Sequence, residues 1–158
     1  MGKNILPDIS IDEKFMSIAL EEARLAIEEG EVPVGAVIEF KGVVFASGHN
    51  KRISKSSAIA HAEIEVIEAA AKKLGDWRLA EMTLYVTAEP CIMCAGAIIH
   101  SRIKRVVYGC KEPKMGAVTS ILNVFDNQKL HHKPAVTSGV MQEECSSILS
   151  SFFKNKRP

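Results

Sequence analysis

The sequence predicts an α/β domain in which helices cover a sheet. Segments rich in β-forming residues alternate with segments of helical periodicity, which is the pattern of layered α/β proteins. The chain has 158 residues, the size of one domain, and no repeat or linker divides it. Its hydrophobic share of 47% and charged share of 25% are ordinary for a globular protein and exclude a mainly disordered chain. We therefore expect a single domain over residues 1–158, with an ordered core at about 10–154 and a basic tail at 154–158.

The first part of the chain is predicted to form a helix followed by a hairpin. Apolar residues recur at helical spacing over 11–29, and Gly30 is the stop signal that ends this helix. Two β-rich runs follow at 33–40 and 43–47. The two-residue connection between them, Lys-Gly at 41–42, predicts that they pair as a β-hairpin.

The remainder of the chain is predicted to alternate helices with short strands. Ile64, Ile67 and Ala71 lie at helical spacing, and Gly75 follows them as a stop signal. Pro90 suits the start of a helix, where proline costs least. The elements expected after the hairpin are a polar loop at 48–57, helices at 60–74 and 91–99, strands at 83–87 and 106–108, a loop-rich basic stretch, and a final helix at about 139–153.

Charged residues are unevenly distributed, although the formal net charge is only +1. Residues 1–31 carry eight acidic and three basic side chains, whereas residues 102–133 carry seven basic and two acidic ones. The tail at 154–157 adds three more basic side chains. A local basic surface is able to bind phosphate groups, although a solvated face explains these charges equally well.

Nothing in the sequence indicates a membrane protein or a secreted one. The longest apolar runs fall well short of the ~20 residues that a membrane span needs. The first eight residues lack the apolar stretch of a secretory signal. We therefore expect a cytoplasmic protein, in which four cysteines do not suggest a disulfide framework.

Two short motifs, His61-x-Glu63 and Pro-Cys91-x-x-Cys94, carry residues that suit a metal centre. One histidine and two thiolates are good zinc ligands, and three protein ligands leave tetrahedral zinc one open position for water. The spacing of the cysteines places them on one face of a helix, whose N-terminus would lower the thiol pKa. Glu63 is two residues after His61, a spacing that does not put the two side chains on the same helix face. Its carboxylate could instead take a proton from that water and pass it to a leaving nitrogen.

A redox pair and a structural zinc site are the alternatives to an open hydrolytic site. A Cys-x-x-Cys pair is also typical of redox chemistry, although that chemistry does not account for His61 and Glu63. A structural zinc would need a fourth protein ligand, for which Cys110, His100 and His49 are the candidates. We favour the open hydrolytic site.

These motifs resemble the signature of the zinc-dependent nucleobase deaminases. Over longer stretches the chain resembles the tRNA-specific adenosine deaminases of bacteria, and the similarity is colinear from about residue 11 to 157. The stretches that carry it are 31–37, 48–50, 60–64, 83–97, 100–103, 107–117 and 151–154.

The resemblance implies a three-layer α/β/α fold of the cytidine-deaminase type, with a central mixed sheet of about five strands. It also implies a homodimer that converts adenosine to inosine at the first (wobble) anticodon position of a tRNA, typically an arginine tRNA with anticodon ACG. The expected partner is thus the tRNA anticodon stem-loop, and no DNA or membrane is expected. The resemblance implies that His61, Cys91 and Cys94 hold one zinc ion per chain. It also implies that Glu63 shuttles protons, and that Asn50, Ala62 and Val34 form the pocket for the base.

An RNA substrate also needs contacts outside the base pocket. Basic side chains hold phosphates and aromatic rings stack on splayed bases, although solvated surface or core packing is the alternative for each. The candidates are Lys51, Arg52, Lys111, Lys114 and Phe153. Two stretches depart from the family pattern, Ser57-Ala58-Ile59 and Leu130-His131-His132, and they put the choice of tRNA in question.

Two different functions remain as alternatives. A deaminase of a free base or nucleotide, such as guanine or cytosine, would not depend on the basic loop or tail. A zinc-stabilised RNA-binding module without catalysis would not depend on Glu63.

Overall fold

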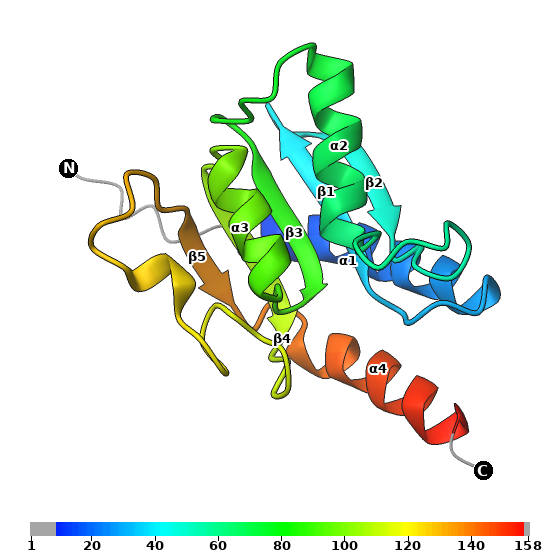
Figure 1. Ribbon diagram of the computed structural model, residues 1–158. Helices are drawn as coiled ribbons and strands as arrows, with labels where there is room; N and C mark the ends of the chain where they lie inside the picture. Colours follow the sequence, from blue (N-terminus) through cyan, green and yellow to red (C-terminus); the bar gives the residue numbers. More distant parts are fainter. Residues whose placement is uncertain (1–8, 157–158) are drawn as a thin grey trace.

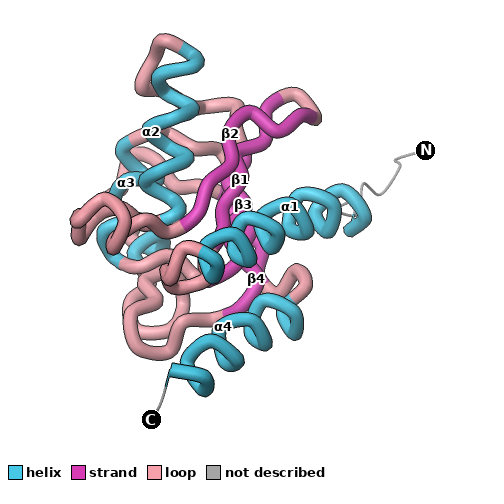
Figure 2. Tube along the Cα trace, turned by 90° about the vertical axis from the view of Figure 1, so that its right-hand side faces the viewer, coloured by secondary structure: helices cyan, strands magenta, loops and turns pink. Residues whose placement is uncertain are grey.

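The computed structural model describes residues 9–156 and has three layers, with a five-stranded sheet between two pairs of helices (Figures 1 and 2). The expected α/β/α arrangement is confirmed. The elements are α1 (Ile9–Glu28), β1 (Gly35–Phe40), β2 (Val43–His49), α2 (Ala62–Leu74), β3 (Thr83–Ala88), α3 (Ile92–His100), β4 (Arg105–Cys110), a 3-10 turn (Val124–Asp126), β5 (Ala135–Ser138) and α4 (Gln142–Lys156).

The sheet is mixed, and its strands lie in the order β2-β1-β3-β4-β5. β1 runs antiparallel to both β2 and β3, whereas β3, β4 and β5 are parallel to one another. Figure 2 shows α2 and α3 on one side of the sheet and α1 and α4 on the other. Because α3 begins just after β3 ends, its N-terminus lies at the carboxyl edge of the parallel strands.

The central strands are buried on both faces because each helical layer packs against its own side of the sheet. In β3, Leu84 and Val86 join the core under α2 and α3, while Tyr85 joins the core under α1 and α4. The helix α1 approaches β1 closely because Gly35 has no side chain: a Cβ there would overlap the backbone of α1.

The predicted hairpin is confirmed by its turn. Lys41 and Gly42 both have left-handed backbone angles, with φ of 53° and 82°. Two such residues make the tight turn whose twist matches that of paired antiparallel strands. β1 and β2 pair on either side of this turn, from Phe40 with Val43 to Gly35 with His49.

The edge strand β5 lies within the stretch that was expected to be loop. Its four residues are largely exposed and carry no alternating pattern, so its conformation depends on pairing with β4. The final helix also begins later than expected, because Gly139 and Met141 form a left-handed turn before it. It continues to Lys156, so most of the expected basic tail is helical, and Arg157 lies outside the described residues.

None of the helices within residues 9–156 combines the length and the apolar character that a membrane crossing requires.

A buried polar network joins α1 to the sheet. The carboxylate of Asp12 accepts hydrogen bonds from the Tyr85 hydroxyl at 2.8 Å and from two nitrogens of Arg105 at 2.9 and 2.7 Å. Arg105 also donates to the Thr137 hydroxyl of β5, at 2.8 Å. Burial alone would raise the pKa of Asp12, but the hydrogen bonds from Arg105 and Tyr85 outweigh it and hold that pKa below its usual value.

We expect Asp12→Asn to destabilise the fold by about 3 kcal/mol, because it leaves the Arg105 guanidinium without its anion. The stability that the low Asp12 pKa contributes is present above the ordinary aspartate value of about 4 and is lost as the pH falls below it. Urea unfolding of both proteins at pH 7 and at acid pH measures this. The difference between them should be largest at pH 7 and shrink on acidification, and equal midpoints at pH 7 would contradict the assignment.

Candidate active site

Three side chains that could hold a metal ion meet at the N-termini of two helices. His61 is the residue before α2, Cys91 is the residue before α3, and Cys94 lies in the first turn of α3. The His61 Nδ1 atom is 3.6 Å from the sulfur of Cys91 and 3.6 Å from that of Cys94. A tetrahedral zinc about 2.3 Å from sulfur and about 2.0–2.1 Å from nitrogen would separate the two atoms by roughly 3.6 Å. The donor set and its spacing therefore fit zinc.

The structure corrects the expected setting of Cys91. Both cysteines were predicted to lie within one helix, but Cys91 precedes α3 and has extended backbone angles, with φ of −76° and ψ of 176°. It forms an isolated bridge with Gly116 instead. Pro90 accordingly stands one residue before the cap rather than at the first helical position. The thiols still face the positive end of the helix dipole, which favours the thiolate form that binds metal.

The three ligand candidates stand alone within residues 9–156, where no further His, Cys, Asp or Glu completes a group of four. The candidates for a fourth ligand are engaged elsewhere or distant in the fold. The thiol of Cys110 donates to the Thr87 carbonyl, and both ring nitrogens of His49 contact glutamates, while His100 ends α3. An open position thus suits this site better than a closed structural one.

Hydrogen bonds among the three candidate ligands shift their pKa values. Hydrogen bonds from Cys94 and His61 lower the pKa of the Cys91 thiol to about 4. The hydrogen bond to Cys91 also raises the pKa of His61 above its usual range. The pairing with Cys91 and burial raise the pKa of Cys94. Metal binding requires these groups to release their protons, so it is coupled to pH.

Glu63 lies beside this group, as the second residue of α2, and is only 4% exposed. Burial raises the pKa of its carboxyl above the usual glutamate value. A raised pKa makes a carboxylate a stronger base, which suits the proton-accepting role of a general acid–base. As expected from the spacing, Glu63 is not among the three residues whose atoms cluster as ligands.

A pocket of about 310 Å³ opens over these residues. Of the predicted site residues, nine line it, and Cys94 lies buried behind them. Lys51 and Lys111 are outside its lining. Five further lining residues were not predicted from the sequence: Val32, Ala88, Glu89, Glu112 and Met115. The predicted residues that the pocket brings together are Val34, Asn50, Arg52, His61, Ala62, Glu63, Cys91, Lys114 and Phe153.

One wall of the pocket is the segment that follows β2. Asn50 is buried there and makes only long side-chain contacts, at 3.5 Å to the Val32 carbonyl and 3.3 Å from the Arg52 N–H. Its amide therefore keeps capacity for a ligand. The buried carboxylate of Glu31 holds the loop beyond it, since it accepts the backbone N–H groups of Ile53 and Ser54 at 2.9 and 2.8 Å.

A second hollow of about 490 Å³ adjoins this wall and shares Val32, Asn50 and Arg52 with the pocket. Its other lining residues are Glu31, Ile53, Ser56, Ser57 and Ala58, so the atypical stretch at 57–59 contributes to it.

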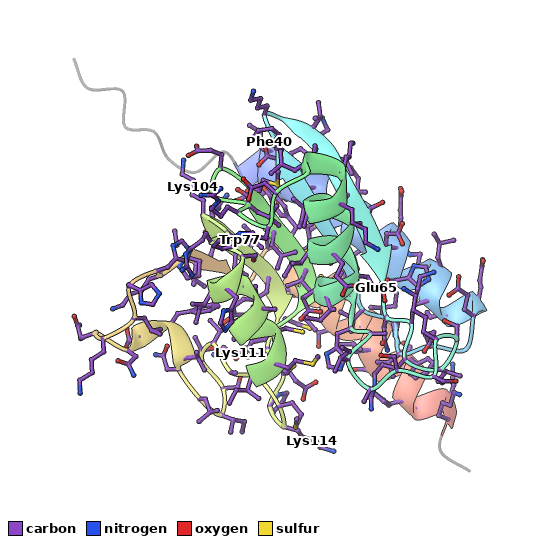
Figure 3. All side chains as sticks on the ribbon, turned by 45° about the horizontal axis from the view of Figure 1, so that its top comes forward. Phe40, Glu65, Trp77, Lys104, Lys111 and Lys114 are labelled. Atoms are coloured by element: carbon purple, nitrogen blue, oxygen red, sulfur yellow. The ribbon has the colours of Figure 1, made fainter. Side chains whose placement is uncertain are left out.

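The opposite wall is the loop after β4, which brings Glu112, Lys114 and Met115 to the pocket. Figure 3 shows Lys114 at the lower end of the molecule and Lys104 toward its upper end. Phe153 of α4 also lines the pocket, and 47% of it is exposed. It is thus not the core residue that one interpretation of the sequence allowed.

Comparison with known proteins agrees with this site. A family model described as MafB19-like deaminase matches residues 10–157. The chain is 47% identical over 146 residues to the tRNA-specific adenosine deaminase of Bacillus subtilis, which covers 92% of this chain and 91% of that protein. It is 50% identical over 147 residues to the tRNA-specific adenosine deaminase of Haemophilus influenzae, which covers 92% and 85%.

A similar solved structure comes from a study of A-to-I editing by tRNA:A34 deaminases at the wobble position of transfer RNA. It matches with a TM-score of 0.84 and 47% identity, over 86% of this chain and 99% of that one. The chain therefore belongs to the MafB19-like deaminases and, by its relatives, to the family of tRNA-specific adenosine deaminases, which are hydrolytic enzymes.

Proposed function

We propose that this protein hydrolyses adenosine to inosine at the wobble position of a tRNA, with the arginine tRNA of anticodon ACG as its substrate. The observation that carries the proposal is the buried carboxyl of Glu63 beside a zinc-competent ligand group at the floor of a pocket. Relatives that are 47% and 50% identical to this chain are tRNA-specific adenosine deaminases, which supports a tRNA substrate.

Each group of pocket residues has its own role in the proposed reaction. One zinc ion held by His61, Cys91 and Cys94 would lower the pKa of a bound water toward ~7 and so supply the nucleophile. Glu63 takes a proton from that water and delivers it to N1 of adenine, which prepares C6 to accept the oxygen. Glu63 then carries the second proton to the exocyclic nitrogen, so that the C6–N bond breaks and ammonia leaves.

Asn50 and Val34 hold the base during these steps. The Asn50 amide hydrogen-bonds an edge of the flipped-out base, and the backbone at Ala62 does likewise. Val34 packs against the ring. Extruding a base costs a few kcal/mol, and least where the base is already unpaired, as in an anticodon loop.

The surroundings of the pocket favour RNA over a free base. A free base needs one closed pocket, whereas the hollow that shares Asn50 and Arg52 with this pocket offers room for a neighbouring nucleotide. In this proposal the exposed ring of Phe153 stacks on a splayed base, and Lys51, Arg52, Lys111 and Lys114 hold phosphates.

The remaining parts of the proposal concern the whole chain. We infer that residues 1–158 act as one catalytic domain in the cytoplasm, where tRNA is processed. We also infer a homodimer, which the family resemblance implies; exposed apolar side chains on α3 and on the loop that follows β4 are available for an interface. These residues are Ile92, Met115, Ile121 and Leu122.

The test is an inosine assay on an unmodified tRNA transcript with anticodon ACG, read by reverse transcription as guanosine at the first anticodon position. The expected result is stoichiometric conversion at that position alone. A protein that holds one zinc per chain but leaves the transcript unchanged would contradict the proposal, and activity on guanine or cytosine would then establish the free-base alternative.

A related prediction concerns Lys111 and Lys114. Changing both to Gln should weaken tRNA binding and make the slope of log affinity against log salt shallower by about 1–2. The reason is that each phosphate contact releases counterions on binding, and the variant makes two fewer contacts. Binding titrations at several salt concentrations measure this slope. The matched control is Lys41→Gln with Lys104→Gln. Lys41 follows β1 and Lys104 precedes β4, so both lie at the edge of the sheet where β3 begins, opposite the edge that carries the ligand group (Figure 3 labels Phe40 and Lys104). An unchanged slope would remove Lys111 and Lys114 from the RNA surface.

A further inference from the structure

Glu89 is a buried carboxylate that the proposed reaction does not use. It stands between β3 and the metal-ligand turn, separated from Cys91 only by Pro90, and it is 3% exposed. The hydrogen bonds of its carboxylate all reach across to the loop after β4. One oxygen accepts the N–H groups of Val118 (3.1 Å), Thr119 (2.8 Å) and Ser120 (3.0 Å), and the other accepts the N–H of Glu112 (3.2 Å) and the hydroxyl of Ser120.

This arrangement determines the path of the loop. A buried carboxylate is tolerated only where donors replace its water, and hydrogen bonds to a charged acceptor are about twice as strong as neutral ones. Three consecutive N–H groups converge on one oxygen and form an anion-binding nest, in which the carboxylate is the anion. Gly116 makes room for the carboxylate, since a Cβ at that position would overlap it.

The same loop is tied to the metal-ligand turn by its backbone. The N–H of Ala117 donates to the Pro90 carbonyl at 2.9 Å, and Gly116 bridges Cys91. Between these ties and β4, the loop carries Lys114 and Met115 into the pocket lining. The position of this wall relative to the ligand group is thus set by contacts on both sides of Pro90.

We propose that Glu89 is a positioning residue, whose carboxylate holds the loop at 111–120 as a fixed wall that receives the RNA substrate. This inference rests on the proposed function for the identity of the substrate. It assigns Glu89 no contact with the reacting atoms: the residue acts through Lys114 and Met115. Losing it should therefore affect substrate binding more than turnover.

The test replaces Glu89 with Gln, which keeps the size of the side chain but removes its charge and turns one acceptor into a donor that faces donors. We expect KM for the ACG tRNA to rise at least about tenfold, with kcat within a few-fold of wild type. The zinc content should stay at one per chain. Hydrogen exchange followed by NMR should show faster exchange for the amides of Val118, Thr119 and Ser120, while amides of β1 keep their protection.

Two further variants separate this role from loss of stability. Ser120→Ala removes one of the five donors and should raise KM less than Glu89→Gln does. Asp12→Asn removes a buried carboxylate outside the pocket, so it should lower stability and leave KM unchanged. An equal rise in KM for Asp12→Asn would overturn the positioning role.

Three more outcomes bear on this role. Unchanged exchange at residues 118–120 in Glu89→Gln would overturn it, because the carboxylate would then not hold the loop. Loss of zinc together with loss of kcat would also overturn it, because Glu89 would then support the ligand turn instead. If the wild-type protein fails to convert the tRNA, the proposed function fails, whereas the exchange measurement still decides whether Glu89 anchors the loop.

Discussion

Glu63→Gln should abolish turnover while the protein keeps its metal. The substitution preserves the size of the side chain, but it turns one acceptor oxygen into a donor, and an amide cannot accept a proton from water at neutral pH. General acid–base catalysis contributes about 10²–10⁴-fold, and Glu63 moves two protons in each cycle of the proposed reaction. We therefore expect kcat on the ACG tRNA to fall at least about 10³-fold. Because Glu63 is not one of the three clustered ligands, zinc should remain at one per chain.

Glu65→Gln is the matched control. Glu65, labelled in Figure 3, lies on the same helix two residues further on. It pairs with Lys55 at 2.8 Å and is not among the residues that line the pocket. Its replacement should leave kcat within a few-fold of wild type. Single-turnover kinetics with excess enzyme separates a slow chemical step from slow product release. A rate like that of wild type for Glu63→Gln would contradict the mechanism, and would favour an RNA-binding module in which zinc has a structural role.

The site's chemistry could be predicted from the sequence because its parts are local. His61 and Glu63 are two residues apart, and Cys91 and Cys94 three apart, so each pair is visible as a motif. The two motifs come together because α2 and α3 pack side by side on one face of the sheet, and the expected α/β/α fold includes this packing. The error over Cys91 was small for the same reason, since a cap residue and a first-turn residue both sit at a helix N-terminus.

The walls of the pocket could not be predicted in this way. Glu89 lies within a stretch that carried the family resemblance, but its partners Glu112 and Ser120 are 23 and 31 residues later. No local pattern specifies such a contact. The strand β5 was missed because its exposed residues carry no alternating pattern, and it forms by pairing with β4. Lys111 is a candidate because of its charge and its place in the loop after the strand predicted at 106–108, but it lies outside the pocket lining.

Cys94→Ala should remove the metal, and with it the reaction. Cys94 is fully buried in the first turn of α3, and its sulfur lies 3.6 Å from His61, the separation expected between two ligands of one zinc ion. Alanine keeps the helix, since it has the highest helix propensity, but it leaves two protein ligands where three are needed. We expect the zinc content to fall well below one per chain. Turnover should fall at least about 10³-fold, because the metal supplies several kcal/mol to the reaction.

Cys145→Ala separates loss of the ligand from loss of a buried thiol. Cys145 is equally buried, in α4 against β4, and lies outside the ligand group. This variant should hold one zinc per chain and keep its activity, although the small cavity lowers stability somewhat. Metal analysis of both proteins after gel filtration, beside their urea midpoints, makes the comparison. Stoichiometric zinc in folded Cys94→Ala would show that the ligand set is wrong. Loss of zinc from both variants would show instead that metal retention depends on the core as a whole rather than on the thiolate of Cys94.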